Sequence, residues 1–320
     1  MQTSPILPTM MLRTPFAIAS AMVLFGCAAR SAAPSPAVEL RPGPAASPPD
    51  ASGGDGGEIL LWGRTGDAPP RTYRLAPDGT GRVIAEEEGI VIATSRGEWR
   101  WETSGVSVAT KPCDWGNGPE GEAGTGSMTR ASLRLRAGGN EHQDVIVPTA
   151  PDGVAEIEHV VTVNGSVGPV LFLEEGTYEY ACGAHGGSEA EFHAWDVERG
   201  KAIDLLAQVP DLGTLKVRAE KILDDGEEDP EEARREDSPP ELVQLLPVYD
   251  AQGRLKLDGQ FARFACYACG DGMWSSYTRS AVIPSGWIPE RLAPFAAPPE
   301  GVTAFVSARR GFKLGGWSRR

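Results

Sequence analysis

The sequence has few of the residues and patterns that usually mark an enzyme's active site. Only four histidines occur among 320 residues, and none lies in an HExxH pattern. A GxSxG nucleophile elbow, a GxxxxGK[ST] phosphate loop and an EF-hand spacing are also absent. Residues 116–121 match GxGxxG, but no strand precedes them and Pro119 interrupts them, so no dinucleotide site is predicted. We therefore predict a non-enzymatic protein without a cofactor.

Basic residues and long apolar runs are also in short supply. Thirty Lys and Arg face 44 Asp and Glu, which gives a formal net charge of −14. Nucleic-acid binding relies on cationic side chains, so we expect no nucleic-acid partner. Anionic lipid surfaces would repel the chain as well. The apolar run 16–25 has ten residues, about half of the roughly 20 that span a bilayer.

This apolar run ends in a motif with a specific meaning. Arg13 precedes the run, and the last two residues of the run begin the motif Leu24-Phe25-Gly26-Cys27. The segment resembles the type II signal peptide of bacterial lipoproteins, in which the lipobox cysteine is acylated and becomes the new N-terminus. The resemblance covers residues 1–27 only. It implies a signal peptide over 1–26, acyl chains such as palmitate on Cys27, and anchoring in the cell envelope. The alternative is an ordinary secreted protein.

The residues after Cys27 predict a spacer and a sorting destination. Ala28 and Ala29, with no Asp after the cysteine, imply by the same resemblance sorting to an outer membrane. Residues 28–57 contain six Pro, five Gly and four Ser with no apolar periodicity. Such a composition predicts an unstructured tether, so 27–57 is interpreted as anchor and spacer.

From residue 58 the pattern becomes that of a β protein. Short apolar or alternating runs recur about every eight to twelve residues and are separated by Gly, Pro and Asp. This spacing predicts an antiparallel meander domain over 58–210, either sandwich-like or propeller-like. The expected strands are 59–62, 72–75, 82–85, 90–93, 98–101, 106–109, 132–136, 145–147, 157–163, 170–173, 177–182, 191–195 and 202–206.

After residue 210 the sequence predicts a smaller α+β portion, which we assign to 211–320. Apolar residues between Leu212 and Leu223 fall at helical spacing, with Asp211 as the predicted N-cap. An acidic loop occupies 224–240, and longer strands are expected at 242–249, 255–267 and 274–283. The first two form a predicted hairpin around 250–253. One further strand is expected at 302–306. The whole chain is thus predicted to be mainly β.

Besides Cys27, four cysteines remain: Cys113, Cys182, Cys266 and Cys269. An even number in an exported protein indicates disulfides, and four cysteines allow three pairings. The preferred pairing is Cys113–Cys182 with Cys266–Cys269, because the first two flank Gly-rich loops. Zinc held by all four thiolates and a redox role for the CxxC pair are the alternatives.

A second group of candidate residues lies just after Cys182. His185 and His193 could bind a metal ion with Cys182, completed by Glu189 or Glu191, although the spacing matches no recognised motif. The alternative is that His193, on a predicted strand, is a structural histidine.

The functional prediction is accordingly broad. We expect a membrane-anchored extracytoplasmic lipoprotein that presents a binding or scaffold surface to a protein or glycan. The first alternative is a metal-dependent or carboxylate-based hydrolase. The second is a glycan or peptidoglycan binder, since Trp99 and Trp101 share one strand face and would stack on sugars if exposed.

Overall fold

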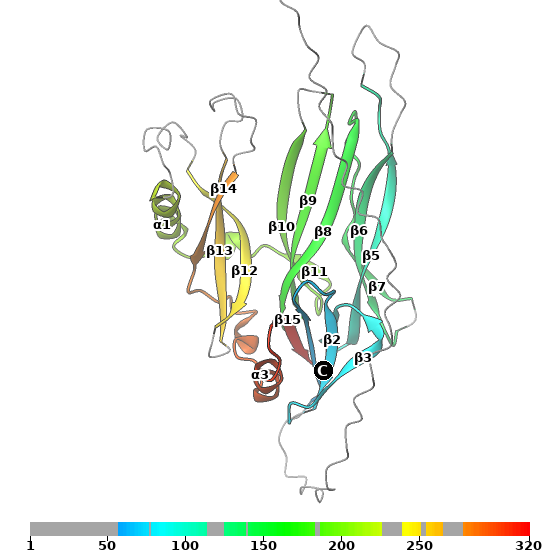
Figure 1. Cartoon of the computed structure of the whole chain (residues 1–320), viewed down its shortest axis with the longest axis vertical. Helices are drawn as coiled ribbons and strands as arrows, with labels where there is room; N and C mark the ends of the chain where they lie inside the picture. Colours follow the sequence, from blue (N-terminus) through cyan, green and yellow to red (C-terminus); the bar gives the residue numbers. More distant parts are fainter. Residues whose placement is uncertain are drawn as a thin grey trace, which may run out of the picture. The chain divides into compact units, whose positions relative to one another are not determined.

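The computed structural model describes residues 57–76, 78–113, 125–138, 140–182, 186–225, 239–250, 254–264 and 278–320, and it omits the side chains of 85–88 (Figure 1). The predicted signal peptide, Cys27 and the tether up to residue 56 lie outside these ranges, as do most of the acidic loop, His185, Cys266 and Cys269. Residues 54–320 form one compact unit. No helix within the described ranges is long and apolar enough to cross a membrane.

The largest element is an eight-stranded sheet with the order β11-β10-β9-β8-β6-β5-β4, in which β7 also pairs with β6. Neighbouring strands are antiparallel except for a short parallel bridge between β6 and β8. This sheet contains most of the predicted meander, whose first three strands lie in a second sheet, and the mainly β class is confirmed. Its strands are β4 (Val91–Thr94), β5 (Gly97–Ala109), β6 (Thr125–Leu135), β7 (His142–Ile146), β8 (Glu156–Val167), β9 (Val170–Tyr180), β10 (Gly187–Asp196) and β11 (Lys201–Ile203).

Two pairs of predicted strands turn out to be single long strands. The runs 98–101 and 106–109 are both part of β5, and 170–173 continues through Gly176 to the end of β9. The intervening residues are polar or small, which looked like breaks in the sequence. Their backbones nevertheless stay paired, since Gly105 lies opposite Thr129 and Gly176 opposite Val160. Backbone pairing does not require an apolar side chain at every position.

A four-stranded antiparallel sheet, ordered β15-β1-β2-β3, packs against the first sheet. It contains β1 (Ile59–Thr65), β2 (Arg71–Leu75), β3 (Gly81–Glu88) and β15 (Phe312–Arg319). Leu60 packs with Val91 and Ala93 of β4. Two buried hydrogen bonds join the sheets: the Ala93 amide donates to the Ser318 hydroxyl at 2.7 Å, and Trp62 Nε1–H donates to Ser166 Oγ at 2.7 Å.

The predicted α+β portion is present as a three-stranded sheet and a helix. The sheet contains β12 (Glu241–Tyr249), β13 (Leu255–Phe264) and β14 (Thr278–Pro284), and α1 (Leu212–Asp225) packs against β14 (Figure 1). The expected helix and hairpin are confirmed. Asp211 has a positive φ of 51°, and its carboxylate accepts a hydrogen bond from the Thr214 hydroxyl rather than from a backbone N–H. Two 3-10 turns, Leu206–Gln208 and Ala293–Phe295, complete the connections.

The strand expected at 302–306 is wrong. These residues belong to the helix α3 (Glu300–Ser307), which follows Pro299. The buried residues Val302 and Phe305 are spaced by three, so they face the same side of a helix and pack near Trp317. The strand of this region is β15, whose Gly315 and Gly316 obscure its alternation. A Cβ at Gly315 would lie 2.2 Å from the Trp62 ring, so packing requires glycine there.

A buried ion pair ties the C-terminal region to the eight-stranded sheet. Asp196, at the end of β10, is fully buried and accepts hydrogen bonds from Arg291 Nε and Nη2 at 2.7 and 2.9 Å. The hydrogen bond to Asp196 raises the pKa of Arg291 above its ordinary value. A bidentate pair of this kind fixes both side chains in one geometry. The loop before Ala293 is thereby held against the β10–β11 hairpin.

We expect Arg291→Met to lower the free energy of unfolding by about 3 kcal/mol, because it leaves the buried Asp196 carboxylate with the Arg199 amide at 3.2 Å and the exposed Arg199 guanidinium at 3.5 Å. Urea unfolding followed by fluorescence measures the loss. The exposed Arg64 supplies the control variant Arg64→Met, which should change stability little. The double variant Asp196→Asn/Arg291→Met should recover part of the loss. A change below about 1 kcal/mol in the single variant would contradict this role.

Candidate functional site

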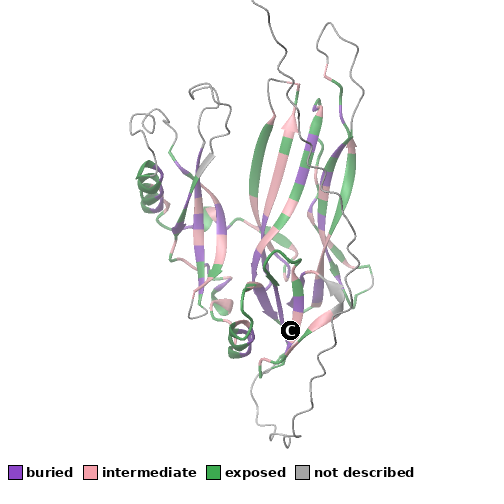
Figure 2. Cartoon of the chain, in the orientation of Figure 1, coloured by how far each residue is buried: buried purple, intermediate pink, exposed green. Residues whose placement is uncertain are grey.

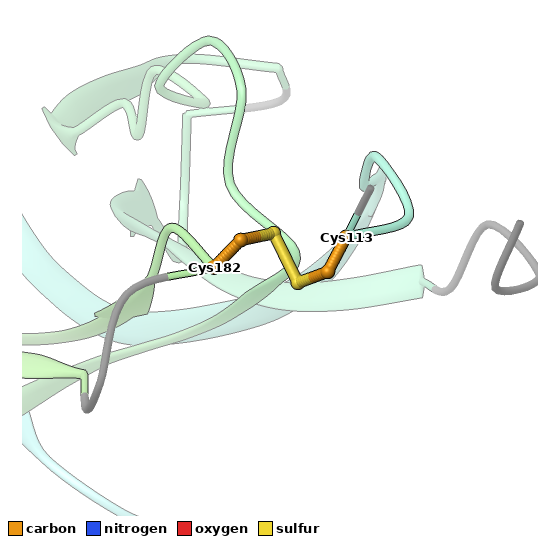
Figure 3. Close-up of a disulfide and its surroundings, with 2 residues drawn as sticks. All are labelled: Cys113 and Cys182. Atoms are coloured by element: carbon orange, nitrogen blue, oxygen red, sulfur yellow. A yellow bond between two sulfur atoms is a disulfide. The ribbon is translucent and has the colours of Figure 1, made fainter. Parts of the chain in front are cut away.

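The structure joins two of the candidate cysteines. Cys113 follows β5 and Cys182 follows β9, and they form a disulfide with a Cα–Cα distance of 5.3 Å across a sequence separation of 69 (Figure 3). This is the first bond of the pairing preferred from the sequence, and the second, Cys266–Cys269, lies outside the described residues. Cys182 also has a positive φ of 60°, which is unusual for a residue with a side chain. Because its sulfur is bonded to Cys113, Cys182 is not a metal ligand here. The alternative of zinc held by four thiolates is likewise inconsistent with this disulfide.

His193, the described histidine of the predicted metal set, lies next to two other ionisable residues. Its Nε2 is 2.8 Å from Glu175 Oε2, and the other oxygen of Glu175 is 2.6 Å from Nε2 of His159. His159, Glu175 and His193 come from β8, β9 and β10 respectively. Glu191 lies directly opposite Glu175 in the β9–β10 ladder. Four side chains from three adjacent strands therefore meet on one face of the sheet.

The orientation of Glu175 is set by its buried neighbour. His159 is 2% exposed, and its Nδ1 accepts a hydrogen bond from the Thr129 amide of β6 at 3.0 Å. The proton of the neutral ring must then be on Nε2, which donates to Glu175 Oε1. The second oxygen of Glu175 is left to face His193. Sequence reasoning identified His193 and Glu191 but missed Glu175 and His159, which only the strand register brings to the same place.

A second site lies where the four-stranded sheet meets β5 and β6. It is a pocket of about 480 Å³ that contains five arginines and two glutamates. Its lining residues are Arg74, Gly97, Glu98, Arg100, Glu102, Arg134, Leu135, Arg136, Ala137 and Arg320. On a chain with a net charge of −14, this arginine pocket is a local concentration of positive charge.

Glu98 organises one half of the arginine pocket. Its carboxylate is buried and accepts hydrogen bonds from Arg74 Nη2 at 2.8 and 3.1 Å. Arg136 also donates to it, and Arg320 Nη1 lies 3.8 Å away. The buried negative charge is thus surrounded by three guanidinium groups, as the burial of a carboxylate requires. This half of the pocket links the two sheets.

The other half of the arginine pocket has an unbalanced positive charge. Arg100 on β5 lies directly opposite Arg134 on β6, so two cations face each other across the ladder. Arg134 pairs with Glu102 at 3.0 Å, whereas no described carboxylate contacts the half-buried Arg100. Like charges directly opposite one another destabilise a sheet. An anion between them would remove this repulsion, and guanidinium groups bind carboxylate and phosphate through two parallel hydrogen bonds.

The tryptophans do not form a sugar-binding platform among the described residues. Trp99 is fully buried, and Trp101 packs against the same hydrophobic cluster. The remaining four described tryptophans also lie in hydrophobic clusters or pack against them, namely Trp62, Trp195, Trp287 and Trp317. Figure 2 shows that the exposed stretches of the strands lie elsewhere, for example along the first half of β10. The described tryptophans therefore do not provide the exposed stacking surface expected for a glycan binder.

Comparisons with known proteins give little further information. No protein family model and no curated protein match the chain. Among solved structures, it is similar to the crystal structure of a DUF3298 family protein from Pseudomonas aeruginosa PAO1. The identity is 13%, the match covers 62% of this chain and 94% of the other, and the TM-score is 0.35. A score this low supports no inference about fold or activity.

We expect removal of the disulfide in Cys113→Ala/Cys182→Ala to lower the free energy of unfolding by about 3 kcal/mol, because the bond closes a long loop and restricts the unfolded chain. Chemical denaturation with and without a reductant measures the effect. Reductant should destabilise the wild-type protein by at least a similar amount and change the double variant less, because only the predicted Cys266–Cys269 bond remains in the variant. If the variant and the oxidised wild type unfold at the same denaturant concentration, the cross-link does not stabilise the fold.

Proposed function

We propose that the protein is a lipid-anchored binding protein of an extracytoplasmic compartment, and that its arginine pocket holds an anionic group of the partner. The anchor is Cys27, placed in the sequence motif that resembles a lipobox. The residues between Cys27 and β1 act as a spacer, so that the β body stands away from the membrane. The Cys113–Cys182 disulfide supports an oxidising compartment such as the cell envelope. An outer-membrane location follows from Ala28 and Ala29.

The observation that carries the binding role is the half-buried Arg100, which faces Arg134 with no described acidic partner. Arg134 has Glu102 as its partner, so an additional anion would balance the remaining positive charge of Arg100. The pocket is open enough at about 480 Å³ to admit a phosphate or carboxylate group, and its other arginines already have a carboxylate. The partner that supplies this anion is a protein or a glycan.

Lipidation is tested with Cys27→Ala. We expect the wild-type protein to partition into the detergent phase and the variant into the aqueous phase, since each buried CH₂ contributes about 0.8 kcal/mol to membrane binding. Intact mass should show the acyl chains on the wild type only. Ser31→Ala, a change in the spacer, serves as the control and should stay lipidated. A mature wild-type product without lipid on Cys27 would contradict the proposed anchor.

Anion binding is tested by calorimetry of the full-length protein with pyrophosphate and with citrate as separate probes. We expect Arg100→Gln to weaken binding of the preferred anion by about 10-fold, the loss of one charge-assisted hydrogen-bonding group. Folding stability without ligand should be unchanged or slightly higher, because the repulsion with Arg134 is relieved. The preference between the probes identifies the anion type.

Arg64→Gln is the matched control for anion binding, because it removes one exposed positive charge outside the pocket. It should leave the affinity for either anion within about twofold, as expected for a distant, screened charge. Equal losses in both variants would show nonspecific charge attraction. That result, or no binding of either probe at millimolar concentration, would overturn the binding role of the pocket.

A further inference from the structure

We propose that Glu175, Glu191 and His193 form a binding site for a divalent transition-metal ion of the zinc type. One ligand atom from each of these residues lies within 4.8 Å of the others. Ligands held at about 2.1 Å by one zinc ion must lie within about 4.2 Å of each other. The exposed side chain of Glu191 can close this small difference by rotation, whereas Glu175 and His193 are half-buried. The site is independent of the arginine pocket.

The strand register explains why these three residues converge. Glu175 of β9 and Glu191 of β10 are directly opposite each other, and His193 is two residues beyond Glu191 on the same face. Side chains at opposite and diagonal positions of an antiparallel pair are near neighbours. The two carboxylates facing each other would repel, so the bare cluster is electrostatically unfavourable. A divalent cation balances their two negative charges.

His159 provides an independent observation that favours a metal over a simple hydrogen-bonded cluster. This buried ring, fixed by the Thr129 amide, holds one oxygen of Glu175 and turns the other toward His193. Carboxylates and imidazoles that bind metals are commonly oriented in this way by a second layer of hydrogen bonds. His193 Nε2 and Glu175 Oε2 lie 2.8 Å apart, at hydrogen-bonding distance. A metal ion placed between them would bind both atoms in place of this contact.

The chemistry of the ligands selects the ion. One imidazole nitrogen and two carboxylate oxygens suit zinc and its first-row neighbours, whereas calcium and magnesium prefer oxygen ligands only. Three protein ligands leave a fourth position for water or for a group on a partner. His159 does not bind the ion in this arrangement, because its Nδ1 is occupied by the Thr129 amide and its Nε2 carries the proton given to Glu175. It acts as a positioning residue.

The test uses untagged full-length protein, kept oxidised, and Zn²⁺ added to metal-free buffer. We expect one equivalent to bind, measured by competition with a chromogenic chelator. His193→Gln and Glu191→Gln should each weaken binding by at least about 10-fold, the size of effect known even for second-layer residues. Co²⁺ in place of zinc should give the visible absorption of a low-coordinate site, which is lost in both variants.

Two controls separate this site from weak surface binding. His142→Gln removes an exposed histidine that lies 3.7 Å from Asp144, and Glu189→Gln removes the other glutamate considered from the sequence, which is not one of the three converging residues. Neither should change zinc affinity by more than about twofold. Glu191 is exposed, so Glu191→Gln should fold normally, which melting of the metal-free protein confirms. Absence of stoichiometric binding, or equal losses in the controls and the site variants, would overturn the proposal and leave a structural hydrogen-bonded cluster.

Discussion

The pairing of β15 with β1 is the interaction on which the rest of this architecture depends. It brings residues near position 318 alongside residues near position 60, and it completes the sheet that packs on β4. The Ser318 hydroxyl then accepts a hydrogen bond from the Ala93 amide, which links the two sheets. Without this pairing, Trp317 and Leu61 would lose part of their shared cluster. One strand close to the C-terminus, β15, therefore helps to hold the two largest sheets together.

Both candidate sites result from this arrangement of sheets, in different ways. The arginine pocket needs two sheets, because Arg74 and Arg320 come from one and Arg100 and Arg134 from the other. The cluster around Glu175 needs only the register of three adjacent strands, β8 to β10. The side chains of the Glu175 cluster and Arg74, Arg100 and Arg134 of the pocket stand on strands, whereas Arg136 and Arg320 directly follow strands. Strands are rigid and hold polar groups in a fixed geometry, which suits a binding site better than the adaptable geometry of a loop.

Much of the fold could be predicted from the sequence, because alternation and turn residues are local signals. Runs such as that from Ser132 to Arg136 show the period of a half-buried strand directly. Local signals failed where packing decides the outcome. Val302 and Phe305 fit a strand or a helix, and only their burial against Trp317 selects the helix. Gly315 was misleading for a similar reason, since its role is to admit the Trp62 ring.

The sites were harder to predict than the fold. Alternation shows that Glu175 and His193 lie on strand faces, but it does not show which strands are neighbours or how they are shifted. The pairing of β8 with β9 also contains an irregularity between Val163 and Gly165, which no local pattern reveals. The arginines of the pocket are separated by up to 246 positions in the sequence, from Arg74 to Arg320. Their convergence is a property of sheet packing alone.

The Cys113–Cys182 bond has a consequence for the order of events in the life of the molecule. Until these two thiols are oxidised, no covalent bond joins the ends of the segment between Cys113 and Cys182, and the unfolded chain is less restricted. On the proposed export route, the reduced chain would be easier to unfold and to thread through a translocation channel than the oxidised one. Oxidation of the two thiols after transport would then add the final constraint on the fold.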